Sequence, residues 1–376
     1  MKSQLLPEGF RDSLPNLAEL EYKINSIFLD LMKSNGFLMV KPPLVEFESS
    51  LFFLRKDKEN LDSFRVMDPL SQKIMGIRSD MTMQIARISC GSLSKDVRPL
   101  RLCYVGEVLK VKNNNINMSR QFTQVGAEII GVEKDFFLGE LINLIIENLN
   151  KLGIKKFVVN FSMPNLINAI KKDFKLNKSD FEKVVNCYKN KNLQEIRNIS
   201  DKLYKISEFL LGSVGRIEDK ILHIKKFKFT KNLQLEIENF VSQIKKIGDD
   251  FKYQNFMIDP LEIDESEYHS GFCFKVYSEN LKELFSGGGY IVKDENCCGF
   301  SGFLENIILE STIKLKEKKR ILANFDLQIN SKYELQKKGF IVIKSSKNLK
   351  EKNIISEAKR QRCKFYFLNN KVVGVN

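Results

Sequence analysis

The chain has 376 residues, of which 43% are hydrophobic and 10% aromatic, as expected for a folded protein with more than one domain. No apolar segment has the length of a membrane span or the pattern of a signal peptide, so we expect a cytoplasmic protein. A net charge of +14 is compatible with nucleic-acid binding. The excess is mostly lysine, which we interpret as spread over solvent-facing helices and loops, so nucleic acid is not an expected partner.

The cysteine and histidine content argues against a secreted disulfide-bonded protein and against a protein with a His-rich metal site. Seven scattered cysteines form no C-x-x-C pair and no secreted disulfide framework, so we expect buried, reduced thiols. With only two histidines, a His-rich metal site is not expected, and neither is a cofactor. The cysteines are Cys90, Cys103, Cys187, Cys273, Cys297, Cys298 and Cys363.

The N-terminal segment predicts a helix followed by an edge strand. Apolar residues recur at steps of three and four between Asn16 and Gly36, with Asn16 and Glu19 spaced as a capping pair and Gly36 as the stop. The strand Phe37–Val40 then runs into Pro42-Pro43, which cannot donate to a β-ladder. This pattern favours either a strand at a sheet margin or a contact between subunits.

The middle of the chain predicts an antiparallel sheet with helices packed on it. Because most of its strands are not joined by βαβ spacings, we expect an α+β fold. The predicted helices are Asp135–Leu152 and Leu304–Lys318. The predicted strands are Lys73–Arg78, Leu100–Tyr104, Phe122–Ile130, Phe157–Phe161, Phe272–Tyr277, Leu284–Ile291 and Cys298–Phe303.

Two regions differ from this pattern. Residues 165–253 are lysine-rich, have helical periodicity and almost no strand signals, and so predict a helical insertion within a domain of residues 1–318. Residues 319–376 predict a small C-terminal α/β domain, with Asn369-Asn370 as a hairpin turn. Its predicted elements are the strands Phe340–Ile343, Phe365–Leu368 and Val372–Val375 and the helix Ile354–Arg360.

Six segments, in this order, resemble the class II aminoacyl-tRNA synthetase catalytic domain in its histidyl form. The resemblance covers roughly residues 5–165 and 255–318, and it implies an antiparallel sheet with flanking helices and a dimer formed through motif 1. The segments are Leu6–Asp12, Asn35–Glu46 as motif 1, Arg78–Thr82, Tyr104–Glu128 as motif 2, Glu267–Phe274 with Gly287–Gly289 as the histidine signature, and Gly299–Asn306 as motif 3.

This resemblance implies a binding site for free L-histidine. Asp80 and Thr82 stand where the family holds the α-amino group, Gln124 where an amide meets the polar end of the ligand, and Glu128 where a carboxylate pairs with the imidazole. Tyr268 and His269 occupy the signature, with His269 in place of a second tyrosine.

Each of these features also has a purely structural interpretation. Asp80 or Thr82 is equally typical of a helix N-cap, and Gln124 with Glu128 of a solvated stripe on one face of a strand. His269 on its own is typical of a structural histidine, and Gly287–Gly289 of a hairpin turn. Only the joint agreement of these residues with one pattern favours a binding pocket.

The ATP site of the synthetase pattern is altered at four positions. The three arginines that the pattern places around the phosphates read Lys110, Asp264 and Asn306, and the motif 2 glutamate reads Lys112. Lysine can neutralise a phosphate but cannot bind it in a bidentate manner, and an aspartate repels it. The resemblance therefore implies a chain that has lost the ability to adenylate an amino acid.

A synthetase scaffold without these arginines resembles the regulatory subunits of ATP phosphoribosyltransferase, the enzyme that begins histidine biosynthesis. This narrower resemblance is carried by Arg78–Thr82 followed by Gln84–Arg87, and by the tail segments Ser356–Arg360 and Cys363–Val373. It implies a non-catalytic subunit in a hetero-oligomer with a short-form catalytic subunit, required for activity and for feedback inhibition by histidine. Two alternatives are an active histidyl-tRNA synthetase and an RNA-binding synthetase paralogue, the latter based on the net charge and the lysine-rich insertion.

Overall fold

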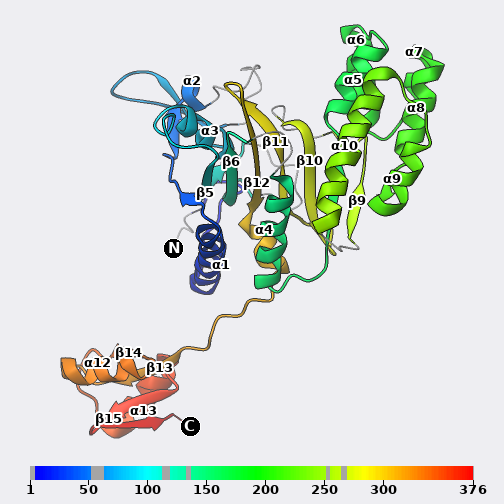
Figure 1. The fold of residues 1–376 in the computed structure, drawn as a ribbon. Coiled ribbons are helices and arrows are strands. Elements are labelled where there is room, and N and C mark those ends of the chain that lie inside the picture. The colour runs from blue at the N-terminus through cyan, green and yellow to red at the C-terminus, as the bar shows by residue number, and fades with distance from the viewer. Residues whose placement is uncertain are drawn as a thin grey trace. The chain divides into compact units, whose positions relative to one another are not determined.

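The computed structural model of the chain describes residues 5–51, 63–111, 119–132, 137–250, 255–263 and 269–375. The chain divides into two compact units, Met1–Ile313 and Lys314–Asn376, and each is described by itself (Figure 1). Within the described residues, no helix combines the length and the apolar character that a membrane span requires.

A nine-stranded mixed sheet is the centre of the described part of the first unit (Figure 1). Its central strands, from β5 to β7, are antiparallel, while β1 pairs with β5 and β9 with β7 in parallel. The predicted α+β fold with a largely antiparallel sheet is confirmed, and the two parallel pairs lie towards the margins of the sheet, where β8 again pairs antiparallel with β9. In spatial order the strands are β1 (Leu38–Met39), β5 (Leu100–Leu109), β6 (Gln121–Ile130), β12 (Glu295–Phe303), β11 (Glu283–Val292), β10 (His269–Ser278), β7 (Phe157–Ser162), β9 (Phe256–Ile258) and β8 (Gly215–Arg216).

Helices cover both faces of this sheet, and the two cores that they form show to which face each side chain of β6 points. On one face, α1 (Pro15–Ser34), α4 (Leu138–Lys151) and α11 (Leu304–Glu310) share a core with Val125, Ala127 and Ile129 of β6. On the opposite face, α3 (Thr82–Cys90) packs with buried Met81 and Ile85. Since side chains alternate along a strand, Gln124 and Glu128 of β6 point to the α3 face.

Residues 165–250 are mainly helical. The longest helix of this region, α10, packs against α5, and the apolar side chains of the region continue the core under the sheet. The Asp173 carboxylate anchors the start of α10, because it accepts hydrogen bonds from the backbone N–H groups of Asn232 and Leu233, each at 3.1 Å. The helices are α5 (Asn165–Asp173), α6 (Lys178–Lys189), α7 (Gln194–Ile199), α8 (Asp201–Leu211), α9 (Ile217–Lys225) and α10 (Lys231–Asp250).

Two predicted helix ends are wrong. The capping pair Asn16 and Glu19 does not form, because α1 already begins at Pro15, which supplies a fixed φ and has no N–H to satisfy. The predicted helix Leu304–Lys318 ends at Glu310. There Ser311 turns to an extended conformation, and its hydroxyl donates to the carbonyl of Leu152 at 3.0 Å, so the chain is tied to the end of α4 instead of continuing as a helix.

The segment around Pro42-Pro43 lies at the margin of the main sheet and beside a smaller one. β1 is the edge strand, which confirms the prediction of a sheet margin. The smaller sheet has the order β2-β4-β3, with β2 (Val45–Phe47), β4 (Ile74–Ile77) and β3 (Arg65–Met67), and the short helix α2 (Glu48–Leu51) follows β2.

The second unit is a four-stranded sheet with one helix for each crossover. The order is β14-β13-β15-β16, in which the first three strands are parallel and β16 is antiparallel. Asn369 and Asn370 have φ of +49° and +57°, which confirms the predicted hairpin turn between β15 and β16. The elements are β13 (Lys319–Ala323), α12 (Ile329–Lys337), β14 (Phe340–Lys344), α13 (Glu351–Arg360), β15 (Phe365–Leu368) and β16 (Lys371–Gly374).

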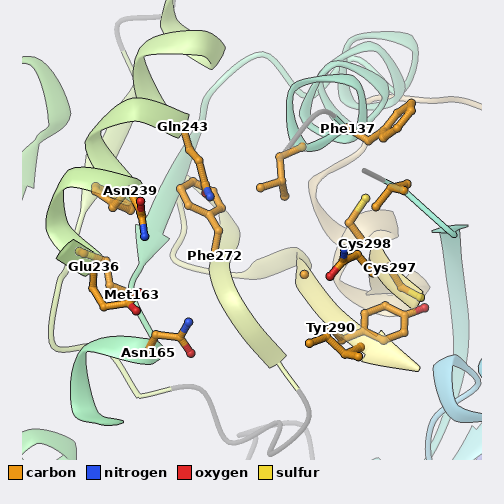
Figure 2. A pocket seen from close by; sticks show the side chains of 16 residues that line it. Phe137, Met163, Asn165, Glu236, Asn239, Gln243, Phe272, Tyr290, Cys297 and Cys298 are labelled. Carbon is orange, nitrogen blue, oxygen red and sulfur yellow. The ribbon is translucent and has the colours of Figure 1, made fainter. Parts of the chain in front are cut away.

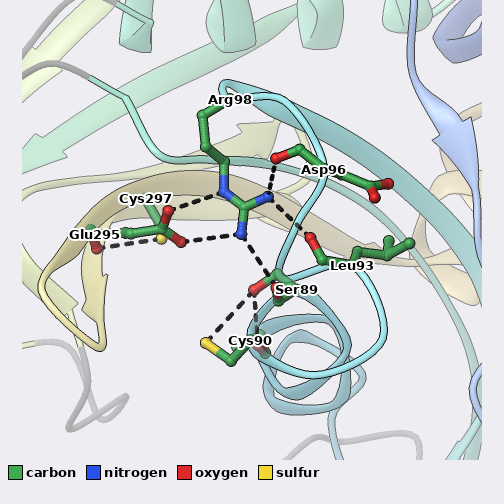
Figure 3. Close-up of polar contacts among 8 residues, drawn as sticks. Ser89, Cys90, Leu93, Asp96, Arg98, Glu295 and Cys297 are labelled. Atoms are coloured by element: carbon green, nitrogen blue, oxygen red, sulfur yellow. Dashed lines mark hydrogen bonds and ion pairs between the residues drawn. The ribbon is translucent and has the colours of Figure 1, made fainter.

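Arg98 joins the end of α3 to the hairpin between β11 and β12 (Figure 3). Its guanidinium donates to the carbonyls of Ser89, Leu93 and Asp96 at 3.0–3.1 Å. It also donates to both carboxylate oxygens of Glu295, at 2.9 and 3.3 Å. One planar side chain therefore fixes the position of α3 against the sheet.

We expect Arg98→Ala to lower the free energy of unfolding by about 2–3 kcal/mol, because it leaves several partly buried acceptors without their charged donor. Arg98→Lys should fall between Ala and wild type. Urea unfolding followed by far-ultraviolet circular dichroism measures this, since the chain contains no tryptophan.

The matched control is Arg197→Ala. The Arg197–Asp201 pair is 3.9 Å apart and its side chains are 70% and 84% exposed, so the change should stay within about 0.5 kcal/mol. Equal unfolding midpoints for the Arg98 and Arg197 variants would contradict the anchoring role.

Candidate functional site

A buried carboxyl group, that of Glu128, is the centre of the candidate site. Its side chain is 1% exposed. One carboxyl oxygen, Oε1, lies 3.1 Å from both Thr82 Oγ1 and the Tyr104 hydroxyl, and Oε2 lies 2.9 Å from the Tyr290 hydroxyl. Three hydroxyls from α3, β5 and β11 therefore surround one carboxyl on β6.

The position of Glu128 changes its ionisation. Burial raises the pKa of its carboxyl to about 8, and the nearby charge of Asp80 acts in the same direction. The hydrogen bonds from the three hydroxyls oppose this rise in pKa but do not cancel it. At neutral pH the group is therefore mostly protonated, unless a cationic ligand reverses the balance.

Gly299 makes room for this carboxyl. It pairs with Glu128 across β12 and β6. A Cβ at this position would lie 1.6 Å from Oε2 of Glu128 and 2.8 Å from the carbonyl of Ala127. Since the backbone of Ala127 cannot move aside without breaking the ladder, only glycine fits here.

The loop before α3 brings Asp80 and Gln124 to the same place. The Met81 N–H donates to Gln124 Oε1 at 2.8 Å, and the Thr82 N–H donates to Asp80 Oδ1 at 2.6 Å. Asp80 thus also stabilises the first turn of α3, as the helix-cap interpretation predicted. The interpretation of Gln124 and Glu128 as a solvated stripe is wrong, because each is 1% exposed.

The same helix is bound on its other side to the segment Pro42–Glu46. Arg78 Nη1 donates to the Pro42 carbonyl at 2.9 Å, and Gln84 Nε2 donates to the Pro43 carbonyl and to Glu46 Oε1, both at 2.8 Å. Arg87 forms an ion pair with Glu46, whose side chain is 7% exposed. The run from Arg78 to Arg87, which carried the narrower resemblance, is therefore the connection between the candidate site and motif 1.

Sequence reasoning missed Tyr104 and Tyr290 as members of the site. A usable signal existed, because a tyrosine inside an apolar strand needs a partner for its hydroxyl and a glutamate inside an apolar strand needs donors. Pairing the two requires the order β5-β6-β12-β11, which spacing alone does not give.

The remaining predicted positions divide into described and undescribed ones. Tyr268, Lys112 and Asp264 lie outside the described residues, and for His269 only the backbone is described, paired with Tyr290. At the two described ATP-site positions, Lys110 Nζ lies 4.4 Å from the centroid of the Phe303 ring, and Asn306 Nδ2 donates to the carbonyl of Glu283 at 2.8 Å. Both side chains therefore have partners within the chain.

A pocket of about 360 Å³ adjoins the cluster (Figure 2). Glu236, Asn239 and Gln243 of α10 face Tyr290, Cys297 and Cys298 across it. The predicted residues on α3 and β6 do not line this pocket, but Tyr290 belongs to both places, because its hydroxyl contacts Glu128. Amide, carboxyl and aromatic groups together suit a small polar molecule.

Metal binding has no support in the described part of the chain. No group of three or more His, Cys, Asp or Glu side chains is placed there to hold an ion. The chemistry available to the cluster is the binding of a ligand that can donate to, or share a proton with, a buried carboxyl.

Comparisons with known proteins agree with this scaffold. A family model described as histidyl-tRNA synthetase matches residues 9–307. The ATP phosphoribosyltransferase regulatory subunit of Paramagnetospirillum magneticum is 31% identical over 287 residues, which cover 76% of each chain. The regulatory subunit of Rhodospirillum rubrum is 28% identical over 364 residues, covering 96% of this chain and 94% of the relative.

Solved structures show the same fold. A Bacillus halodurans protein, described as an ATP phosphoribosyltransferase regulatory subunit/histidyl-tRNA synthetase, has a TM-score of 0.82 at 21% identity, covering 96% of this chain and 97% of that one. Histidyl-tRNA synthetase from Nostoc sp. PCC 7120 has a TM-score of 0.78 at 17% identity, covering 98% and 92%. The chain therefore belongs to the histidyl-tRNA synthetase family and, within it, to the ATP phosphoribosyltransferase regulatory subunits.

Proposed function

We propose that this regulatory subunit binds free L-histidine at the Glu128 cluster and thereby confers feedback inhibition on a short-form ATP phosphoribosyltransferase catalytic subunit in the cytoplasm. The names of the relatives support the regulatory role and a catalytic partner. The observation that carries the ligand assignment is the buried Glu128 carboxyl beside Asp80, surrounded by hydroxyls that can rotate.

The chemistry of this cluster fits an amino acid with a basic side chain. A carboxyl whose pKa is about 8 holds a proton near pH 7, so a neutral imidazole can take up that proton and remain paired with the resulting carboxylate. The hydroxyls of Thr82, Tyr104 and Tyr290 are donors in the unliganded state and can also accept, so they can reorient around a ligand. Asp80 offers a second carboxylate for the α-amino group.

The described remains of the ATP site argue against adenylation. A site that activates an amino acid needs fixed cations aimed at the α-phosphate, and loss of one such group costs about 10²–10³ in rate. Here Asn306 is held by a backbone carbonyl and Lys110 lies over an aromatic ring. We therefore propose that histidine acts as an effector and not as a substrate.

Exposed apolar side chains near β1 and β2 support self-association as a dimer. Leu38, Met39, Leu44 and Phe47 are 40–60% exposed. The first three lie on the segment that the resemblance assigns to motif 1, and Phe47 follows it directly. This segment also carries the acceptors bound by Arg78, Gln84 and Arg87 of the α3 region. A dimer contact here would be in direct mechanical contact with the histidine site.

Regulation requires a coupling free energy between histidine and the substrates of the partner, typically about 1–3 kcal/mol, and the coupling is reciprocal. The decisive assay measures phosphoribosyl transfer by the co-purified complex with and without histidine. Inhibition that depends on this subunit supports the proposal, and absence of histidine binding by both the subunit and the complex would refute it.

The family model also favours a second candidate, an active histidyl-tRNA synthetase. Histidine-dependent exchange of pyrophosphate into ATP separates the two. We expect exchange no faster than that of a blank, and exchange at a synthetase-like rate would make the regulatory proposal untenable.

We expect Glu128→Gln and Asp80→Asn each to weaken histidine binding about 10- to 100-fold, because each removes a charge-assisted hydrogen bond and keeps the shape of the side chain. Asparagine at position 80 keeps the acceptor for the Thr82 N–H, so α3 should stay intact. Calorimetric titration with histidine measures the loss, and gel filtration with the catalytic subunit checks that assembly is unchanged.

The control for these variants is Glu279→Gln, which removes a carboxylate from an exposed ion pair with Lys156 and should bind histidine like wild type. Unchanged histidine affinity in both site variants would contradict the assignment.

The pKa of Glu128 also predicts a pH-dependent stability. The folded protein has a pKa of about 8 at this group, above the ordinary glutamate value of 4.5, so between these two pH values the folded state holds a proton that the unfolded state has released. The contribution of the protonated Glu128 carboxyl to the free energy of unfolding is fully present below about pH 4.5 and is lost as the pH rises through about 8.

The difference in unfolding free energy between Glu128→Gln and wild type should therefore change by about 1.4 kcal/mol per pH unit between pH 5.5 and 7.5, in favour of the variant. Urea unfolding at three pH values measures this slope. Because the comparison is a difference, it cancels the effect of other groups that titrate in this range, such as Glu305, where burial raises the pKa of the carboxyl to about 7. A slope near zero would mean that Glu128 is ionised in the folded protein.

A further inference from the structure

The positive charge of the chain is concentrated in its second unit. Lys314–Asn376 contains 17 of the 61 lysines and arginines but only 5 of the 47 aspartates and glutamates, so it carries +12 of the net +14. The first unit, with 44 basic and 42 acidic residues, is nearly neutral. The excess of basic over acidic residues is therefore almost entirely a property of the second unit.

This partition is not explained by a general preference for lysine. Such a preference acts on both units, yet in the first unit acidic residues balance the basic ones almost completely. A net charge of +12 on 63 residues also destabilises a compact fold through self-repulsion, so it is typical of a surface that meets a polyanion.

Part of this charge gathers at one edge of the sheet, where the parallel strands β13 and β14 end. The connections that follow these strands are joined, because the Asp326 N–H donates to Asn348 Oδ1 at 3.2 Å and Asn348 Nδ2 returns a bond to the Asp326 carboxylate at 2.9 Å. The carboxyl ends of parallel strands are where open α/β sheets bind ligands. We call this surface the carboxyl edge and define it by Phe325, Lys344, Lys347 and Lys350.

The carboxyl edge combines exposed cations with an exposed ring. Phe325 is 59% exposed, and Lys344 Nζ lies 5.3 Å from its ring centroid. Lys347 and Lys350 follow in the same connection and are exposed. Among the described residues of this unit, the ion pairs are formed by cations other than the three lysines of the carboxyl edge. The acidic residues next to the edge in the sequence are Asp326 and Glu351. The ion pairs are Lys337–Glu334, Arg360–Glu357 and Lys364–Glu317.

We propose that the second unit binds single-stranded RNA at the carboxyl edge, with Lys344, Lys347 and Lys350 neutralising phosphates and Phe325 stacking on a base. An acidic protein surface would account for the lysines but not for an aromatic ring exposed among them, whereas cations interleaved with aromatic rings are what single strands require. This function is independent of histidine binding, and its test does not use the activity of the enzyme complex.

The test uses the full chain and a fluorescein-labelled 20-nucleotide oligouridylate, with fluorescence anisotropy at several salt concentrations. We expect an affinity that falls steeply with salt. Replacing Lys344, Lys347 and Lys350 together by glutamine should reduce the slope of log K against log salt by about 2, since each phosphate contact with a single strand contributes about 0.7. Phe325→Leu should weaken binding about tenfold with the salt slope unchanged.

The matched control is the triple glutamine variant at Lys202, Lys205 and Lys226, exposed lysines of the first unit. It removes the same charge and should bind RNA within twofold of wild type. Circular dichroism checks that every variant is folded.

Three results would overturn the proposal. The first is an equal loss of affinity in the two triple variants, which would mean that binding follows total charge. The second is an absence of salt-dependent binding by the wild-type chain. The third is equal competition by polyglutamate of matched charge, together with no effect of Phe325→Leu, which would assign the edge to an acidic protein partner.

Discussion

The burial of one carboxyl group within an apolar sheet is the constraint on which the site depends. Moving such a group out of water is costly unless donors surround it, and here the donors come from three different elements. Their convergence requires the registers of β5, β6, β12 and β11 and a glycine at position 299 to hold together. The donors therefore surround the carboxyl only when these four strands have paired in this register.

Much of the fold was predictable because its signals are local. The strands of the central sheet and the helix before β7 follow from alternation and apolar periodicity, and the Asn369-Asn370 turn follows from the tolerance of asparagine for positive φ. The failures have long-range causes. The helix from Leu304 ends early because Ser311 bonds a carbonyl that lies far away in the sequence. A local pattern does not contain such a partner.

In the candidate site, too, some residues were predictable from the sequence and others depended on long-range contacts. Asp80, Thr82, Gln124 and Glu128 could be selected by matching a family pattern, and the structure brings them together around one carboxyl. The tyrosines that complete the environment come from strands whose neighbours are set by the sheet order. For Asp80 the two competing interpretations turned out to be compatible, because the carboxylate that supports the first turn of α3 also lies beside Glu128.

The short helix α3 has a mechanical consequence. Its first residue, Thr82, contacts the buried carboxyl of Glu128, while Gln84 and Arg87, two and five residues later, hold Glu46 and the Pro43 carbonyl. Nine residues at 1.5 Å per residue give a rod of roughly 14 Å, too short and too well packed to bend. A molecule that shifted the start of this rod would also shift its end, so the proposed histidine site and the margin of the sheet would move together.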